Sequence, residues 1–221
     1  MRAYIVRPWL LALVVLAIAG CSTPSKPPVV STDATDLIAR QAARDALLGD
    51  LEGWQFSGRV KVEGNERPTS AEIQWIKRGE NSRVTLSGPG GFRASTVQVS
   101  PGAVVLRRPD GQVLRADNPD QLIEKLVGWP MPLSLMNDWV LGLPGPANVL
   151  SRDAKAQLEG AQYREWTGKM DRYKSVDTVS MPHRIAVTDG HLRVRISVRE
   201  WDIGPPSAAT SQRIPVPGVG G

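Results

Sequence analysis

The chain has 221 residues, enough for one domain or at most two, and 41% of them are hydrophobic and 22% charged. This composition excludes a wholly disordered chain and a collagen-like one. A single cysteine excludes an intrachain disulfide and a thiolate metal cluster, and two histidines leave little material for a histidine metal site or a Ser-His-Asp triad. We therefore expect no metal and no other cofactor.

Residues 1–20 have the pattern of a secretory signal peptide. Arg2 and Arg7 form a basic start, and the apolar run that follows is too short for a bilayer core of about 30 Å. The run ends in Ile-Ala-Gly-Cys, which resembles a bacterial lipobox and places the only cysteine, Cys21, where a lipid is attached. The alternative is an ordinary signal peptide whose cleavage site happens to precede a cysteine.

Cleavage before Cys21 changes how the net charge is interpreted. The formal net charge falls from +5 to +3, so a pI of 9.7 is weak evidence for nucleic acid, and we expect no nucleic-acid partner. Lipoproteins kept in the inner membrane often carry aspartate after the lipidated cysteine, so Ser22 favours the outer membrane. Residues 21–32 are rich in Pro and Ser and predict a tether from the lipidated cysteine.

The predicted folded body, residues 33–203, begins with a helix. Asp33 or Asp36 can cap the helix, and Gly49 and Gly53 end it. From Phe56 onward the hydrophobic period changes from 3.6 to 2, which predicts antiparallel strands with one apolar and one polar face. The alternating segments are residues 56–63, 71–75, 83–87, 97–99, 104–106 and 113–114.

Two short helices are predicted to interrupt the strands. Asn118-Pro119 is typical of a helix start, with an apolar stripe over residues 122–129, and a second stripe over 133–140 stops before Gly142. Strands resume around Tyr163 to Trp166. The clearest hairpin joins 185–187 to 192–198 through Asp189-Gly190. This order predicts an α+β body, followed by a disordered Pro/Gly-rich tail at 204–221.

No catalytic motif is present in the sequence: there is no phosphate loop, dinucleotide fingerprint, nucleophile elbow or HExxH helix. His183 and His191 have no acidic or nucleophilic partner at motif spacing, so we interpret them as surface residues. Arg193, Arg195 and Arg199 could bind an acidic partner, but alternating arginines usually mark a solvated strand face. We therefore expect no enzyme.

Several motifs, from residue 1 to about 203, resemble the LolB family, the outer-membrane receptors for lipoproteins of Gram-negative bacteria. The most specific is the stretch 132–145, Pro-Leu-Ser-Leu-Met-Asn-Asp-Trp-Val-Leu-Gly-Leu-Pro-Gly. The others are Trp54 with Gly58-Arg59, Trp75, Leu86-Ser87-Gly88-Pro89, Leu122…Leu126…Gly128, Trp166, Tyr173, Met181-Pro182 and Asp189-Gly190.

The resemblance implies a half-open antiparallel β-barrel covered by a lid of short α-helices, with a hydrophobic cavity between them. Family members accept triacylated lipoproteins from the soluble periplasmic carrier LolA and insert them into the lipids of the outer membrane. We accordingly expect a monomer at the periplasmic face of the outer membrane, anchored through Cys21. The residues that would line the cavity are Phe56, Trp75, Leu86, Leu122, Leu126, Trp129, Leu133, Met136, Trp139 and Val140.

The sequence departs from the family in one loop. Members usually present an exposed leucine in a protruding loop after the strand that contains Leu86, and here that position is Gly90. Phe92 is the only large apolar side chain of this predicted membrane-insertion loop. Phe92 either takes over the membrane contact, folds back into the core, or belongs to a loop that works differently.

Two functions of other classes stay open. The first is a structural lipoprotein that binds a partner protein, in which the residues proposed to line the cavity would only fill a closed core. The second is a periplasmic lipid-modifying enzyme, which would need clustered titratable groups with perturbed pKa values in its cavity.

Overall fold

The computed structural model describes residues 32–64, 68–88, 94–118, 120–121 and 133–203. Their contacts divide the chain into two units, residues 1–36 and 37–221. Of the first unit only the start of helix α1 (Thr32–Gly49) is described, and the second unit contains all the strands and helix α3 (Leu133–Leu141). Cys21, the tether, the loop with Gly90 and Phe92, the stripe with Leu122, Leu126 and Trp129, and the tail lie outside the described residues.

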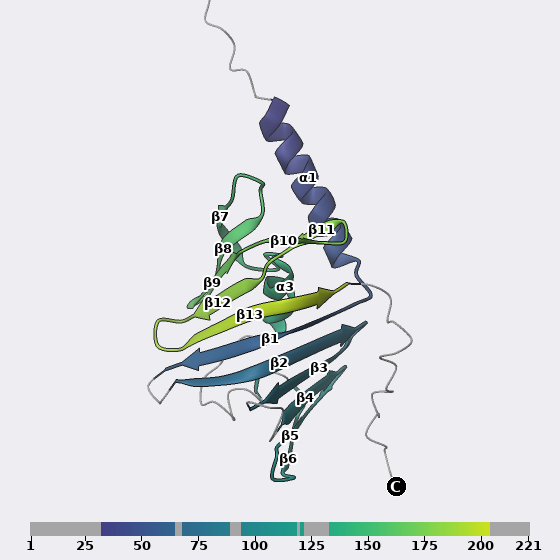
Figure 1. Ribbon diagram of the computed structural model, residues 1–221, viewed down its shortest axis with the longest axis vertical. Helices are drawn as coiled ribbons and strands as arrows, with labels where there is room; N and C mark the ends of the chain where they lie inside the picture. The colour runs from purple at the N-terminus through teal and green to yellow at the C-terminus, as the bar shows by residue number, and fades with distance from the viewer. Residues whose placement is uncertain (1–31, 65–67, 89–93, 119, 122–132, 204–221) are drawn as a thin grey trace, which may run out of the picture. The chain divides into compact units, whose positions relative to one another are not determined.

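Eleven antiparallel strands form one sheet with the order β6-β5-β4-β3-β2-β1-β13-β12-β9-β8-β7 (Figure 1). The strands are β1 (Gly53–Glu63), β2 (Thr69–Arg78), β3 (Asn81–Ser87), β4 (Ser95–Ser100), β5 (Ala103–Arg107), β6 (Val113–Ala116), β7 (Asn148–Arg152), β8 (Leu158–Tyr163), β9 (Trp166–Asp171), β12 (Arg184–Thr188) and β13 (Arg193–Asp202). A separate hairpin pairs β10 (Lys174–Val176) with β11 (Val179–Met181). The edge strands β6 and β7 do not pair with each other, so the barrel is half-open, as predicted.

The predicted alternation of buried apolar and exposed polar side chains along a strand is confirmed in β1. In β1, Trp54, Phe56 and Val60 are buried, whereas Arg59 and Lys61 on either side of Val60 are exposed. Side chains of a strand alternate between the two sheet faces, so one face of the sheet is apolar and the other polar.

The prediction for residues 163–166 is wrong in detail. These residues form the tight turn between β8 and β9, where Tyr163 pairs with Trp166 and Arg164 has a positive φ of 54°. The strands already resume at Asn148, in β7, which the sequence did not reveal because its Val149 and Leu150 are consecutive and exposed. Their exposure breaks the alternation by which a half-buried strand is recognised.

Two predicted helix boundaries, the start after Asn118 and the end of α3, agree with the structure. The Asn118 side chain accepts a hydrogen bond of 2.8 Å from the Asp120 amide, which is the predicted cap. At the end of α3, the Leu143 amide bonds to the Asp138 carbonyl and the Gly142 amide to the Trp139 carbonyl, with Gly142 at φ 72°. This is a Schellman motif, and it needs glycine because L-residues rarely adopt that φ.

Replacing Gly58 with alanine is expected to lower the free energy of unfolding by about 2–3 kcal/mol. A Cβ at Gly58 would lie 2.3 Å from the Ser197 carbonyl oxygen, so the β1 and β13 backbones would have to separate at their register shift. The measurement is urea unfolding followed by circular dichroism.

The matched control is Gly160→Ala in β8. Its Cβ would meet the Ser151 Oγ at 2.9 Å, and this hydroxyl can rotate away. The control should cost less than about 1 kcal/mol. Equal losses for the two variants would contradict the assignment of the effect to the β1–β13 backbone contact.

Candidate functional site

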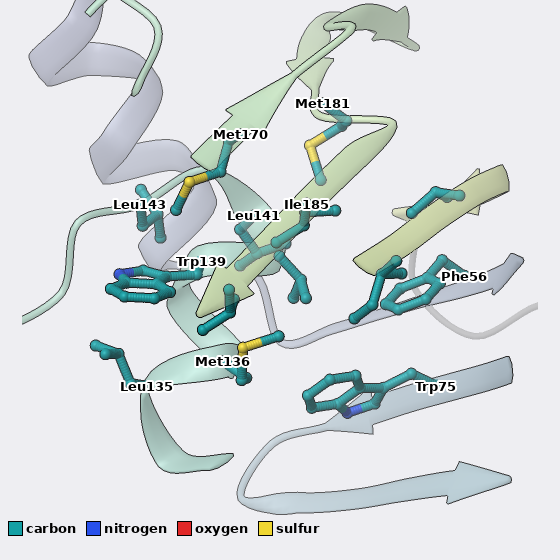
Figure 2. Close-up of a cluster of buried hydrophobic side chains, with 14 of the residues drawn as sticks. Phe56, Trp75, Leu135, Met136, Trp139, Leu141, Leu143, Met170, Met181 and Ile185 are labelled. Atoms are coloured by element: carbon teal, nitrogen blue, oxygen red, sulfur yellow. The ribbon is translucent and has the colours of Figure 1, made fainter. Parts of the chain in front are cut away.

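The apolar face of the sheet and helix α3 share one cluster of buried side chains. The sheet contributes the inward residues of β1, β2, β8, β9, β12 and β13, and α3 contributes Leu135, Met136, Trp139, Val140 and Leu141. Figure 2 shows Trp75 and Phe56 on neighbouring strands, facing the α3 residues Met136 and Trp139. This apolar interior is the candidate site.

Four aromatic rings form the wall on the strand side of the interior. Trp54, Phe56, Trp75 and Trp201 have ring centroids 4.9–6.1 Å apart for each contacting pair. Phe56 and Trp75 lie directly opposite each other in the register of β1 and β2, and Phe56 opposite Trp201 in that of β1 and β13. Alternation therefore brings rings distant in sequence to one face.

Helix α3 packs against the sheet at a contact between Trp139 and Gly168. Trp139 is fully buried, and a Cβ at Gly168 in β9 would lie only 2.6 Å from two carbons of its ring. Only glycine at this position lets the indole approach the strand. Close apolar packing of this kind holds α3 against β9.

Methionine is prominent around this contact. Met136 of α3, Met170 of β9 and Met181 of β11 are each at most 2% exposed and lie together with Ile185 (Figure 2). Methionine side chains are unbranched and polarizable and can repack around a changing apolar partner. The interior therefore combines rigid aromatic rings with adaptable side chains.

Arg44 of α1 connects α1 to the end of α3. Its Nη2 donates to the Leu141 carbonyl at 2.9 Å and to the Ser180 carbonyl at 2.9 Å, and its Nη1 donates to the Gly142 carbonyl at 3.4 Å. The guanidinium also lies over the Tyr173 ring at 5.7 Å from the centroid. The last carbonyls of a helix lack partners within the helix and carry partial negative charge, so a cation here stabilises the α3 terminus.

Two titratable groups border this region. Burial raises the pKa of the Asp138 carboxyl, which the charge of Lys77 partly opposes. Burial also raises the pKa of Tyr173 well above its usual value, and its hydroxyl donates to the Leu158 carbonyl at 2.7 Å. Tyr173 therefore stays protonated near neutral pH and serves as a hydrogen-bond donor.

The polar face of the sheet holds shared ion pairs. Arg59 and Arg199 both bond to Glu72, and Lys61 and Arg195 both bond to Glu63. Hydrogen bonds from Lys61 and Arg195 lower the pKa of Glu63, and hydrogen bonds from Arg59 and Arg199 lower that of Glu72, while desolvation opposes both shifts. These carboxylates stay ionised near neutral pH. The predicted solvated face is confirmed for Arg193 and Arg199, which are exposed, whereas Arg195 is half-buried and paired with Glu63.

A pocket of about 190 Å³ lies outside the apolar interior, between the β7–β8 turn and the link from β9 to β10. Charged side chains dominate its lining, among them Asp153, Lys155, Asp171 and Arg172. Its chemistry is unsuited to hydrocarbon. Among the described residues, no three metal-ligating side chains come together. No described helix combines the length and apolarity that crossing a bilayer requires.

The structure brings five of the ten predicted cavity residues into one cluster: Phe56, Trp75, Met136, Trp139 and Val140. Leu86 is partly buried and packs against this cluster, and Leu133 begins α3. Sequence reasoning missed Met170 and Met181, although Trp166, Gly168 and Met170 repeat with the period of a strand. It also missed Arg44, because a lone arginine on a helix carries no signal of a distant carbonyl partner.

Comparisons with known proteins agree with this geometry. A family model described as "Outer membrane lipoprotein LolB" matches residues 52–201. Outer-membrane lipoprotein LolB of Chromohalobacter salexigens is 33% identical over 89% of this chain and 91% of its own length. The protein of the same name from Halorhodospira halophila is 29% identical over 88% of this chain and 95% of its own length.

A solved structure supports the fold alone. A LolA superfamily protein from Nitrosomonas europaea superimposes with a TM-score of 0.51 at 9% sequence identity, covering 80% of this chain and 96% of its own. The half-open sheet with a helix on its apolar face is therefore an architecture that a very different sequence also forms.

Proposed function

Since the chain belongs to the LolB family of outer-membrane lipoproteins, we propose that it receives lipoproteins at the outer membrane and inserts their acyl chains there. In this proposal the soluble carrier LolA delivers the triacylated lipoprotein to a single copy of the protein. Cys21, acylated after removal of residues 1–20, anchors the protein to the periplasmic face of the outer membrane. The protein acts without catalysis.

One observation carries this proposal: the contact between α3 and the sheet is apolar on both sides. Met136 and Trp139 face buried sheet residues such as Met170 and Ile185 (Figure 2), and Val140 belongs to the same buried cluster. Moving α3 away from the sheet would expose this apolar lining. Acyl chains are the ligands whose chemistry matches such a lining.

The energetics of a passive transfer fit this lining. Burying hydrocarbon contributes about 0.8 kcal/mol per CH₂. Exposing one chain of about 15 methylenes to water therefore costs roughly 10 kcal/mol. An apolar interior that encloses the acyl chain offsets this cost. A transfer that runs downhill from carrier to receptor to bilayer requires no nucleotide hydrolysis.

The direct test measures transfer of a labelled lipoprotein from LolA to outer-membrane vesicles. Vesicles that contain this protein should gain the label, and vesicles without it should not. The same vesicles bearing the protein with Trp139→Asp, which places a charge in the apolar interior, serve as control. Transfer that does not depend on the protein would refute the proposed function.

A structural lipoprotein with a filled core is the second candidate, and the tight burial of the interior favours it. Trp75 is 4% exposed, and Trp139 and Val140 are fully buried. Tryptophan fluorescence separates the two candidates, because acyl chains that enter the interior must change the surroundings of these rings. An unchanged emission spectrum at saturating lipoprotein would support the filled core.

The loop that carries Gly90 and Phe92 gives a further prediction for the insertion step. Phe92→Glu is expected to leave receipt of lipoprotein from LolA intact and to abolish insertion, because a carboxylate opposes entry into the bilayer surface. Separate assays of receipt and insertion with labelled lipoprotein check this. Normal insertion by a folded variant would mean that Phe92 has no membrane role.

A further inference from the structure

The indole N–H of Trp75 has no hydrogen-bond acceptor in the part of the chain that the structure describes. Trp75 is 4% exposed, and its Nε1 is buried without a hydrogen-bond partner among the described residues. In Figure 2 its ring lies between Phe56 and Met136, with the nitrogen on the ring edge turned away from Phe56. A buried donor without an acceptor is unfavourable, since it has lost the bond to water that it makes in the unfolded chain.

A second tryptophan of the same aromatic wall shows the usual arrangement. Trp201 is also buried, and its Nε1 donates to the Pro182 carbonyl at 3.0 Å. Both rings contact Trp54 and Phe56 in tilted or edge-on arrangements, with centroid distances of 4.9–6.0 Å. The two indoles therefore share their apolar surroundings and differ in whether the donor is satisfied within the protein.

Trp139 and Trp166 also have buried Nε1 atoms without an acceptor in the described part of the chain. Trp139 is wedged against Gly168, so a ligand could reach its nitrogen only by displacing α3 from β9. Trp166 begins β9 and is 1% exposed. Trp75 is the most accessible of the three, at 4% exposed, and it lies on β2, which takes no part in the contact between Trp139 and Gly168.

We propose that the Trp75 Nε1–H is the hydrogen-bond donor for an ester carbonyl of the diacylglyceryl group on an incoming lipoprotein. This inference rests on the proposed function and adds a positioning residue to it. A hydrocarbon chain contains no acceptor, so an apolar lining alone cannot set how deep the chain enters. The ester carbonyl is the acceptor at the head of each chain, and a hydrogen bond to it is strengthened by the low dielectric of the interior.

Trp75 then determines selectivity between lipids whose chains are joined through esters and lipids whose chains are joined through ethers. A lipid whose chains are joined through carbonyl-bearing esters satisfies the indole, whereas a lipid with the same chains joined through ethers leaves the N–H without a carbonyl. A site with a buried polar group rejects the analogue that cannot pair with it. The expected preference for the ester is about fivefold in Kd, in keeping with one neutral hydrogen bond.

The test compares two synthetic lipopeptides, an S-(2,3-bis-palmitoyloxypropyl)cysteine peptide and its di-hexadecyl ether analogue. They are titrated into residues 21–221 with Cys21→Ala, so that no acyl chain of the protein competes. The wild-type interior should bind the ester about fivefold more tightly. In ¹H–¹⁵N spectra, the Trp75 indole resonance should move downfield with the ester and not with the ether.

Replacing the indole by benzothienylalanine, which keeps the ring size and removes the N–H, gives the decisive variants. At Trp75 this change should abolish the ester preference and preserve binding of the ether. At Trp201, the matched control, it should preserve the preference. Trp75→Phe provides a second variant whose folding is checked by its near-ultraviolet circular dichroism.

Three results would count against the inference. Equal affinity of the wild-type protein for ester and ether would overturn the role of Trp75. It would not contradict the proposed binding of acyl chains in the interior. A preference lost equally at Trp75 and Trp201 would also overturn it, because the effect would then be general to the aromatic wall. Binding of neither lipopeptide would refute the proposed function itself.

Discussion

Replacing Arg44 with methionine is expected to lower the free energy of unfolding by about 3 kcal/mol. The variant keeps most of the side-chain volume and leaves the carbonyls of Leu141, Gly142 and Ser180 without their charged donor. The Arg44 side chain is only 13% exposed, so water replaces these bonds poorly. Urea unfolding measures the loss, and hydrogen exchange should show faster opening of the α3 terminus.

Two further variants test whether the loss of stability is specific to the contacts of Arg44. Arg44→Lys keeps the charge and loses the planar fork, so its loss of stability should be intermediate. Arg59→Met removes an arginine whose side chain is 67% exposed and should cost less than about 1 kcal/mol. If Arg44→Met is no more destabilising than Arg59→Met, the link between α1 and α3 contributes little to the fold.

Replacing Cys21 with alanine is expected to eliminate lipid attachment entirely, because no other cysteine is available for acylation. Labelling with radioactive palmitate should leave the variant unlabelled, and mass spectrometry should find no acylated N-terminus. Ser22→Ala, the neighbouring control, should be labelled normally. An acylated N-terminus in the Cys21→Ala protein would disprove the assignment of the anchor.

The anchor and the body are expected to be separable. A soluble chain beginning near Asp33 lacks Cys21 and keeps α1 and the whole sheet. It should therefore still accept lipoprotein from LolA, because the proposed lining lies in residues of the body. A folded chain of this kind that accepts none would argue against a mechanism based on the body.

The first helix shows where sequence patterns begin to fail. The apolar residues of α1 predict a stripe that packs on the core, but only Leu48 is fully buried, while Ile38 and Leu47 are 66% and 50% exposed. The helix ends at Gly49, as predicted, because a glycine stop acts locally, but it begins at Thr32, so the predicted caps Asp33 and Asp36 lie inside it. Burial depends on which surface the helix meets, and no property of the helix itself specifies that surface.

For the candidate site, the sequence indicated which residues lie in the interior, but not which hydrogen-bond partners they have there. Phe56, Trp75 and Trp139, which the resemblance predicts to line a cavity, lie in one cluster of buried side chains. That Trp75 lacks an acceptor while Trp201 has one depends on where the Pro182 carbonyl falls, 19 residues before Trp201. Hydrogen-bond partners at such separations follow from the register of strands and not from composition.

By itself, the sequence determined the features that depend on the geometry of one segment: the strands of period 2, the glycine stop of α3 and the order of elements, which predicts an α+β body. Only the tertiary structure decided that Arg44 meets carbonyls 97 and 136 residues away and that Trp139 fits against Gly168. The reason is physical. Periodicity and caps come from the local backbone, whereas contacts between distant segments exist only after the sheet has brought its strands into register.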